Sequence, residues 1–243
     1  MKIPRIVLAG ATSGVGKTSI TCSIIYALQK RGFSVQPFKV GPDYIDPSYL
    51  SSISKNETYN LDVWLMGKKQ VLESFVSHSN SDISIIEGVM GYYDGFEGNS
   101  NHASTHHVAS ITKSPVILVL DASKTARSIG ATALGFQKFH KNSRIVGIIL
   151  NKIGSKKHEI LCRDALEKTK LSIIGVIPKN PLLNLESRHL GLSSTYDNKI
   201  LKNKLEKVSK IISESLDVDK ILKIIKNPVP IPKNQTKSNK KSK

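Results

Sequence analysis

Residues 10–18 read Gly-Ala-Thr-Ser-Gly-Val-Gly-Lys-Thr and directly follow the apolar run of residues 6–9. Glycines at such a turn let backbone N–H groups approach phosphate oxygens, and the N-terminus of a following helix attracts the same anion. In this pattern Lys17 reaches the β- and γ-phosphates and the Thr18 hydroxyl ligates Mg²⁺. The segment therefore predicts a nucleoside triphosphate site rather than a glycine-rich turn without a ligand. The residues expected to contact the nucleotide here are Thr12, Ser13, Gly14, Val15, Gly16, Lys17 and Thr18.

The spacing of this loop differs from the usual phosphate-binding pattern. In that pattern, G-x-x-x-x-G-K-[ST], the first glycine would stand at Ala11, whereas the leading glycine here is Gly10. The longer loop resembles that of the dethiobiotin-synthetase-like branch of P-loop proteins, whose members activate carboxylates. It therefore indicates chemistry on a carboxylate rather than simple hydrolysis of the nucleotide.

A lysine and two carboxylates share the turn after the second apolar run. Residues 39–47 read Lys-Val-Gly-Pro-Asp-Tyr-Ile-Asp-Pro. This turn carries Lys39, Asp43 and Asp46 at what would be the ligand end of a sheet. Two acids three residues apart, each beside a proline, can also simply shape a turn, so both interpretations stay open on the residues alone.

Two more carboxylates close later apolar runs. Glu87 follows Ile-Ser-Ile-Ile and is placed to hold Mg²⁺ directly or through water. Asp121 closes residues 116–120 and competes with Glu87 as the metal carboxylate. For Asp121 we favour an N-cap role in the following helix.

Residues 88–98 combine four glycines with three aromatic side chains, those of Tyr92, Tyr93 and Phe96. Such a segment is typical of a mobile flap that lies against a large flat substrate. An ordinary long surface loop is the alternative, because glycine and aspartate also favour turns.

Asn151 follows the apolar run of residues 145–150 and begins the sequence Asn-Lys-Ile-Gly. This segment is similar to the base-reading motif Asn-Lys-x-Asp of GTP-binding proteins, except that Gly154 replaces the acid. Without that carboxylate, nothing here pairs with N1 and the exocyclic amine of guanine. We therefore predict ATP as the nucleotide and place Asn151 among the residues that bind it.

Short apolar runs rich in β-branched residues alternate with segments of helical period. Strands that alternate with helices predict an α/β fold of the P-loop NTPase class, with a mostly parallel sheet and helices on both faces. Ligands of such sheets bind beyond the carboxyl ends of the strands. Near the end of the chain, residues 201–216 predict a long amphipathic helix and residues 221–225 a short one. The predicted strands are residues 3–9, 34–40, 83–86, 115–120, 145–150 and 172–177.

Length and composition favour one domain over residues 1–226. The 243-residue chain can bury one α/β core, and its proline-interrupted, lysine-rich end predicts a disordered basic tail over residues 227–243. Part of the net charge of +17 lies in that tail, and the rest follows helix faces without a nucleic-acid motif, so we predict no nucleic-acid partner. No run approaches the ~20 apolar residues of a membrane span, and no signal-peptide pattern opens the chain. We therefore expect a cytoplasmic protein without a membrane partner.

The cysteines and the clustered histidines support neither a disulfide framework nor a metal site. Cys22 and Cys162 stand at helical spacing from apolar neighbours, so both are expected to be core residues. His102, His106 and His107 lack a cysteine or acid at the usual ligand spacing, so we predict no metal site there.

Eight short segments form a combination that is typical of one protein family. They are residues 10–18, 38–47, 60–62, 87–91, 93–95, 126–128, 150–152 and 188–192. Together they resemble the synthetase domain of the cobyrinate a,c-diamide synthase family, which includes the hydrogenobyrinate and nickel-sirohydrochlorin a,c-diamide synthases. The resemblance covers about residues 1–226, and the phosphate loop with the Gly-Pro-Asp-Tyr-Ile-Asp-Pro run makes it specific. Arg127, Arg188 and His189 match family positions but have no derived role.

The resemblance implies ATP-dependent amidation of the a and c acetate side chains of a corrinoid or related tetrapyrrole. ATP phosphorylates the carboxylate in this scheme, and ammonia then displaces phosphate. By similarity, Lys17 and Lys39 neutralise charge on the transferred phosphoryl group. The same similarity assigns Thr18, Asp43 and Glu87 to the magnesium shell.

The resemblance also extends to substrate orientation and to partners. It makes Asp46 and Asp94 candidates for orienting the substrate or the nucleophile, so the predicted catalytic residues are Lys17, Lys39, Asp46 and Asp94. Full-length members continue into a glutamine amidotransferase domain, which we expect to be absent here. Ammonia is therefore expected from a separate glutaminase chain or from solution, and the relatives suggest a homodimer.

Two other functions share the phosphate loop. A dethiobiotin synthetase would have the same long loop, but residues 41–47 argue against it. A ParA/MinD-like regulatory ATPase of the same superfamily usually carries a second lysine early in the loop, where this chain has Ala11, Thr12 and Ser13. Both are therefore alternatives to the amidating enzyme.

Overall fold

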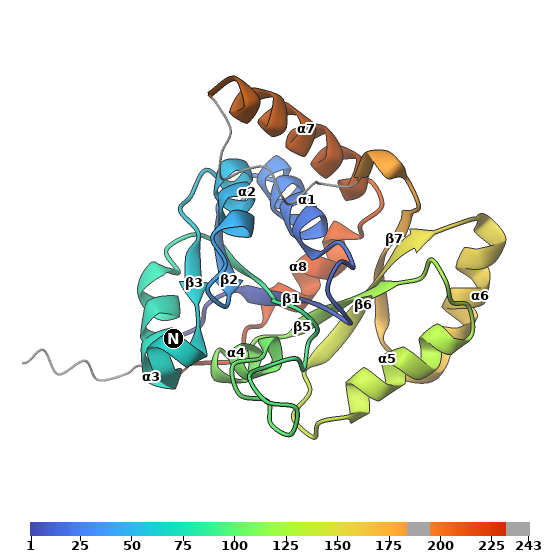
Figure 1. Ribbon diagram of the computed structural model, residues 1–243, viewed down its shortest axis with the longest axis horizontal. Coiled ribbons are helices and arrows are strands. Elements are labelled where there is room, and N and C mark those ends of the chain that lie inside the picture. The colour runs from blue at the N-terminus through green and yellow to red at the C-terminus, as the bar shows by residue number, and fades with distance from the viewer. Residues whose placement is uncertain (184–194, 232–243) are drawn as a thin grey trace, which may run out of the picture.

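The computed structural model describes residues 1–183 and 195–231, which are built around one seven-stranded sheet (Figure 1). Neighbouring strands pair in parallel in the order β3-β2-β4-β1-β5-β6-β7. This arrangement confirms the predicted parallel α/β fold. The strands are β1 (Arg5–Gly10), β2 (Val35–Val40), β3 (Tyr59–Leu61), β4 (Ile83–Glu87), β5 (Val116–Asp121), β6 (Ile145–Ile153) and β7 (Ser172–Pro178).

Helices cover both faces of the sheet. They are α1 (Lys17–Lys30), α2 (Ile45–Ser54), α3 (Val63–His78), α4 (Thr105–Ile111), α5 (Ser128–Lys138), α6 (Lys156–Leu166), α7 (Thr195–Ser213) and α8 (Val218–Lys226). Helices α1, α2, α7 and α8 pack on one face, and α3 to α6 pack on the other (Figure 1). Within the described parts of the chain, no helix has the length and apolar character that crossing a membrane requires.

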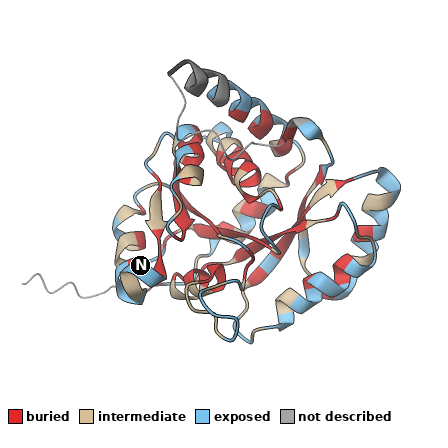
Figure 2. Ribbon diagram, viewed as in Figure 1, coloured by how far each residue is buried: buried red, intermediate tan, exposed pale blue. Residues whose placement is uncertain are grey.

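The central strands are buried on both faces, which explains their continuous apolar sequences (Figure 2). In β1, Ile6 and Leu8 pack with α1, while Val7 and Ala9 pack in the core beneath α3 to α6. Cys22 and Cys162 are buried in these two cores, one on each face, as predicted.

Two elements differ from the sequence prediction. β3 is an edge strand of only three residues beside β2, and its apolar run is too short to be recognised in the sequence. The helix predicted over residues 201–216 ends earlier, because α7 stops at Ser213 and Leu216 forms an antiparallel bridge with Gly175 of β7.

The register of the strands gathers polar residues at the carboxyl edge of the sheet. Glu87, the last residue of β4, lies between Leu8 of β1 and Lys39 of β2. Asp121 at the end of β5 pairs with Asn151 of β6. Residues from four separate segments therefore lie at the edge where the phosphate loop begins.

A buried arginine holds the C-terminal segment against the amino end of the sheet. The guanidinium of Arg5 donates to the carbonyl oxygens of Thr112 (2.6 Å), Ile3 (2.7 Å), Val229 (2.8 Å) and Lys113 (3.2 Å). Ile231 is buried and exchanges backbone hydrogen bonds with Met1. The disorder predicted from residue 227 therefore does not extend to residues 227–231. The rest of the predicted tail lies outside the described residues.

Replacing Arg5 with methionine should destabilise the fold, because several buried carbonyl oxygens lose their donor. We expect urea unfolding to show a loss on the order of 3 kcal/mol in the free energy of unfolding. Arg31→Met is the matched control, since Arg31 pairs with Asp219 at the surface, where ion pairs contribute little. An Arg5→Met protein that unfolds at the wild-type urea concentration would contradict this role.

Candidate functional site

The phosphate loop turns from β1 into α1. Gly14 and Gly16 have φ angles of 73° and 93°, a region that side chains rarely adopt. Gly16 is also the N-cap of α1, and no side chain caps this helix end. The first N–H groups of α1 are therefore left for an anion.

The loop borders a cleft of about 420 Å³ at the carboxyl edge of the sheet. Of the residues predicted from the sequence, the cleft is lined by Ser13, Gly14, Gly16, Lys17, Thr18, Lys39, Asp43, Asp46 and Asn151. Residues that the sequence did not single out for the site also line it, namely Ser19, Ile20, Tyr49, Val89, Met90, Lys152, Pro178, Asn180, Leu183 and Ile212. The structure thus brings most of the predicted site residues together around one cleft.

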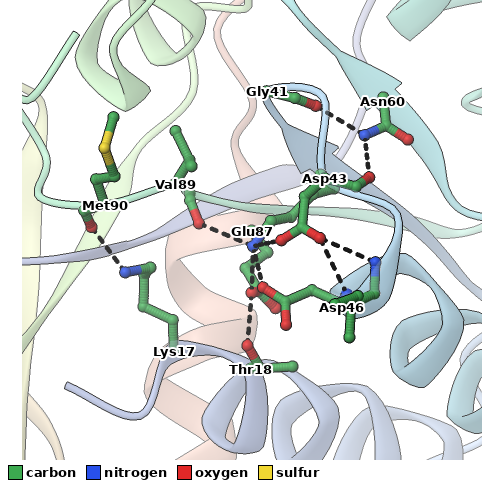
Figure 3. A network of polar contacts seen from close by, with 12 residues as sticks. Lys17, Thr18, Gly41, Asp43, Asp46, Asn60, Glu87, Val89 and Met90 are labelled. Atoms are coloured by element: carbon green, nitrogen blue, oxygen red, sulfur yellow. Dashed lines mark hydrogen bonds and ion pairs between the residues drawn. The ribbon is translucent and has the colours of Figure 1, made fainter. Parts of the chain in front are cut away.

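A buried ion-pair network lies beside this cleft (Figure 3). Lys39 Nζ is 2.8 Å from Glu87 Oε1, 2.5 Å from Asp46 Oδ2 and 3.6 Å from Asp43 Oδ2. The Thr18 hydroxyl donates to the same Glu87 Oε1 at 2.9 Å. The first residues of α1, the end of β2 and the end of β4 therefore meet at one carboxylate.

Burial and charge act in opposite directions on Lys39. Its side chain is only 2% exposed, and burial disfavours the charged ammonium. The carboxylates of Glu87 and Asp46 outweigh that effect and raise the pKa of Lys39 above its usual value. Lys39 is therefore a fixed positive charge beside the phosphate loop.

Glu87 has the properties expected of a magnesium ligand. Its side chain is fully buried, and Oε2 has no hydrogen-bond partner among the described residues. An orphaned oxygen on a carboxylate whose other oxygen accepts from the Thr18 hydroxyl fits a hard cation such as Mg²⁺. In the described part of the chain, no three His, Cys, Asp or Glu residues form a metal site by themselves. A hydroxyl and one or two carboxylates suit Mg²⁺, which usually completes its shell with water and substrate phosphates.

Lys17 points along the loop toward the segment that follows β4. Its Nζ donates to the Met90 carbonyl oxygen at 2.7 Å (Figure 3). Burial lowers the pKa of Lys17, while nearby Glu87 acts against that shift. An ammonium has three donors, so Lys17 can keep this contact and still donate to a phosphate.

Asn151 contacts the phosphate loop itself. Its Nδ2 donates to the Val15 carbonyl oxygen at 2.8 Å, and a Cβ on Gly16 would lie 2.6 Å from that nitrogen. Lys152 is a site residue that the sequence reasoning missed. It pairs with Asp121 Oδ2 at 2.6 Å and approaches the Gly14 carbonyl oxygen at 3.4 Å. Its position after Asn151 at a strand end was the available signal.

The N-cap role predicted for Asp121 is wrong. Helix α5 begins at Ser128, with Arg127 at its N-cap position. Asp121 Oδ1 instead accepts from the Ser123 amide at 2.9 Å, and Oδ2 accepts from Lys152. The interposed turn separates the strand end from the helix.

The segment after β4 is tied to the body of the protein. The Tyr92 amide donates to the Gly10 carbonyl oxygen, and the Tyr92 ring is buried. The Tyr93 hydroxyl donates to the Phe136 carbonyl oxygen at 2.7 Å. The mobile flap predicted over residues 88–98 is therefore anchored at these two residues, since Tyr92 is buried and Tyr93 is half-buried. Phe96 remains exposed.

Four predicted residues do not line the cleft, and two residues that match family positions lie outside the described chain. Glu87 is fully buried and contacts the cleft residues Thr18 and Lys39. Asp94 Oδ2 accepts from the Gly91 amide at 2.8 Å and so shapes the turn after β4. Thr12 is exposed on the phosphate loop, and Val15 is buried beneath it. Residues 188 and 189 fall outside the described residues.

The chain matches the family model described as "CobQ/CobB/MinD/ParA nucleotide binding domain" over residues 6–192. It is 41% identical over 234 residues to a Dehalococcoides mccartyi protein named cobyrinate a,c-diamide synthase, which covers 96% of this chain and 50% of that protein. Proteins of the same name from Listeria innocua and Picrophilus torridus are each 43% identical, over 92% and 93% of this chain and 50% and 51% of theirs. The chain therefore spans about half the length of the curated relatives it matches.

Solved structures with the same fold are more distant in sequence. The MinC:MinD cell division protein complex of Aquifex aeolicus matches with a TM-score of 0.57 and 16% identity, over 94% of this chain and 98% of that one. Chloroplast FtsY from Physcomitrella patens matches with a TM-score of 0.53 and 14% identity, over 86% and 66% of the two chains. At these identities the likeness shows the fold alone.

Replacing Lys39 with methionine should make the protein more stable at mildly acidic pH than at about pH 8. Without the ammonium, the folded state must bury Glu87 beside two other carboxylates, at a cost of about 3–5 kcal/mol. Protonation relieves that cost, so the folded state binds protons more readily than the unfolded state. The free energy of unfolding of Lys39→Met should therefore rise as the pH falls from about 8 to about 5.

Urea unfolding at several pH values checks this expectation. Lys152→Met is the control, because Lys152 and Asp121 are about one-third exposed and water can compensate for the lost pair. If the free energy of unfolding of Lys39→Met does not rise as the pH falls, the proposed charge balance is incorrect.

Proposed function

Because this chain belongs to the CobQ/CobB/MinD/ParA nucleotide binding domain family, we propose that it binds ATP with Mg²⁺ in the cleft and phosphorylates a substrate carboxylate. The observation that carries the proposal is the contact of Thr18, Lys39 and Glu87 beside the phosphate loop. A simple nucleotide site needs the loop and a metal ligand. The additional buried ammonium supplies positive charge where an anionic acceptor must approach an anionic phosphate.

Thr18, Asp43 and Glu87 would hold the magnesium ion. The ion supplies charge neutralisation for the nucleotide phosphates when it is bound. Glu87 supports this assignment because one oxygen is engaged by Thr18 and Lys39 while the other has no partner in the described chain. The Thr18 hydroxyl already contacts that carboxylate, so two of the groups that would hold the ion lie side by side.

The chain's own residues then stabilise phosphoryl transfer. Lys17 and Lys39 neutralise charge on the transferred γ-phosphoryl group, and Asp46 positions Lys39 through its 2.5 Å contact. Asp94 acts indirectly, by holding the turn that presents Met90 to Lys17. An oxygen of the substrate carboxylate bonds to the γ-phosphorus while the bond to the β,γ-bridging oxygen breaks, which yields an acyl phosphate and ADP. Ammonia then attacks the carbonyl carbon and loses a proton, and inorganic phosphate leaves.

The proposed substrate is a corrinoid or related tetrapyrrole, amidated on its a and c acetate side chains. The similarity to proteins named cobyrinate a,c-diamide synthase supports this choice. We propose that ammonia is the nucleophile, supplied by a glutaminase or by the solution.

Amidation is tested by incubating the protein with ATP, Mg²⁺, ammonium chloride and either cobyrinate or nickel-sirohydrochlorin. We expect mass spectrometry to detect one or two acid-to-amide conversions that depend on ATP. ATP hydrolysis that responds to a protein or DNA partner but not to a tetrapyrrole would indicate a regulatory ATPase instead. Carboxylation and ring closure of a diamine would indicate a dethiobiotin synthetase.

Asp43→Asn and Glu87→Gln should each lower turnover by at least about 100-fold while the circular dichroism spectrum stays unchanged. The reason is the loss of a charged magnesium ligand at nearly constant volume. Asp121→Asn is the matched control, since Asp121 lies at a neighbouring strand end and pairs with Lys152. If Glu87→Gln keeps wild-type turnover, or if only Asp121→Asn loses turnover, the metal carboxylate would be assigned to Asp121 instead of Glu87.

A further inference from the structure

Exposed aromatic side chains gather on one side of the carboxyl edge of the sheet. Trp64, at the start of α3, stacks on Phe96 from the loop after β4, with ring centroids 4.0 Å apart and an interplanar angle of 20°. Both side chains are more than half exposed, at 55% and 57%, and the adjacent Leu65 is 69% exposed. We call Trp64, Leu65 and Phe96 the aromatic surface.

The backbone holds this surface in place before any ligand binds. Asp62 caps α3 by accepting from the Trp64 amide at 2.9 Å. Gly67 has a φ of 74° and kinks the helix, so the first turn is not collinear with the rest of α3. The Phe96 amide donates to the His102 carbonyl oxygen at 2.9 Å, and the His102 ring meets Trp64 edge-on at 6.2 Å. Exposing two stacked aromatic rings to water is energetically unfavourable, and such exposed apolar patches are typical of binding surfaces.

The aromatic surface continues directly from the strands that carry the phosphoryl-transfer residues. β3 and β4 flank β2, whose carboxyl end carries Lys39 and leads into the acidic turn. Asn60 of β3 donates to the carbonyl oxygens of Gly41 and Asp43, so the chain leading to Trp64 is joined to that turn. The loop that carries Phe96 starts at Glu87. Asn151 and Pro178 line the cleft from β6 and β7, on the other side of the phosphate loop.

The charge beside the surface suits a polyanionic ring. Lys68 is exposed directly after Gly67, and among the described residues it forms no ion pair, whereas its neighbour Lys69 lies 3.9 Å from Glu73. Burial lowers the pKa of His107, and the positive charge of Lys68 lowers it further. Lys68 is therefore near His107, whose ring lies 5.5 Å from that of His102, the histidine that meets Trp64 edge-on. A flat conjugated ring gains from stacking on aromatic faces, and its carboxylate arms gain from the lysine.

We propose that the aromatic surface of Trp64, Leu65 and Phe96 binds one face of the macrocyclic substrate, while Lys68 contacts a carboxylate arm that is not being amidated. This inference rests on the proposed function, because it names the place where that substrate is held. A linear diamine would have no ring to stack on this surface. The bound ring would bring one acetate arm toward Lys39 and the γ-phosphate.

Steady-state kinetics with cobyrinate, ATP, Mg²⁺ and ammonium chloride test the proposal. Trp64→Ala and Phe96→Ala should each raise the KM for cobyrinate at least 10-fold, with kcat changed less than about threefold and the KM for ATP unchanged. Trp64→Phe and Phe96→Tyr should restore most of the affinity because they keep a flat ring. Phe139→Ala, which removes an exposed aromatic side chain outside the surface, is the matched control and should behave as the wild type.

The single tryptophan allows a binding measurement that needs no turnover. Cobyrinate absorbs where tryptophan emits, so binding should quench Trp64 in the wild type, with at least 10-fold weaker binding in Phe96→Ala. Citrate, a polycarboxylate without a ring, should not compete. An unchanged KM for cobyrinate in Trp64→Ala and Phe96→Ala, with unchanged quenching affinity in Phe96→Ala and amidation intact, would overturn this inference and leave the proposed function standing. Quenching that depends on Phe96 without any amidation would support the surface and contradict the proposed function.

Discussion

The contact between Lys39 and Glu87 is the constraint on which the rest of the site depends. A carboxylate at the end of a central strand, removed from water, is stable only beside a cation or when it is neutral. Lys39 is that cation because β2 and β4 pair in the register that sets the two residues side by side. The same ammonium contacts Asp46, so the acidic turn and the strand end form one unit next to Thr18.

The two sides of the sheet contribute different parts of the site. On the β6 side, Asn151 and Lys152 contact backbone carbonyl oxygens of the phosphate loop and so stabilise its shape. On the side of β3, β2 and β4, the strand ends carry the acids, the buried lysine and the exposed aromatic rings. The residues that shape the phosphate loop from β6 and the proposed acceptor surface therefore lie on opposite sides of β1.

Local sequence patterns predicted the parts of this structure that are local in the chain. The phosphate loop, six of the seven strands and the buried cysteines follow from residue types and spacing. Asp121 was misjudged because Lys152, 31 residues away, reaches it across the sheet edge. The burial of Tyr92 and Tyr93 could not be predicted because exposure of an aromatic ring depends on what packs over it. Here His106 lies against the Tyr92 ring and Phe136 of α5 stacks on the Tyr93 ring.

By itself the sequence determined that this chain has a phosphate loop and alternating strands and helices, and hence at which end of the sheet a ligand binds. Those features depend on neighbouring residues, whose periodicity and backbone preferences are visible in one dimension. Only the tertiary structure decided that Lys39 neutralises Glu87, 48 residues away, and that Trp64 stacks on Phe96. Such pairs depend on strand order and register, which place distant segments side by side, and no local pattern encodes that placement.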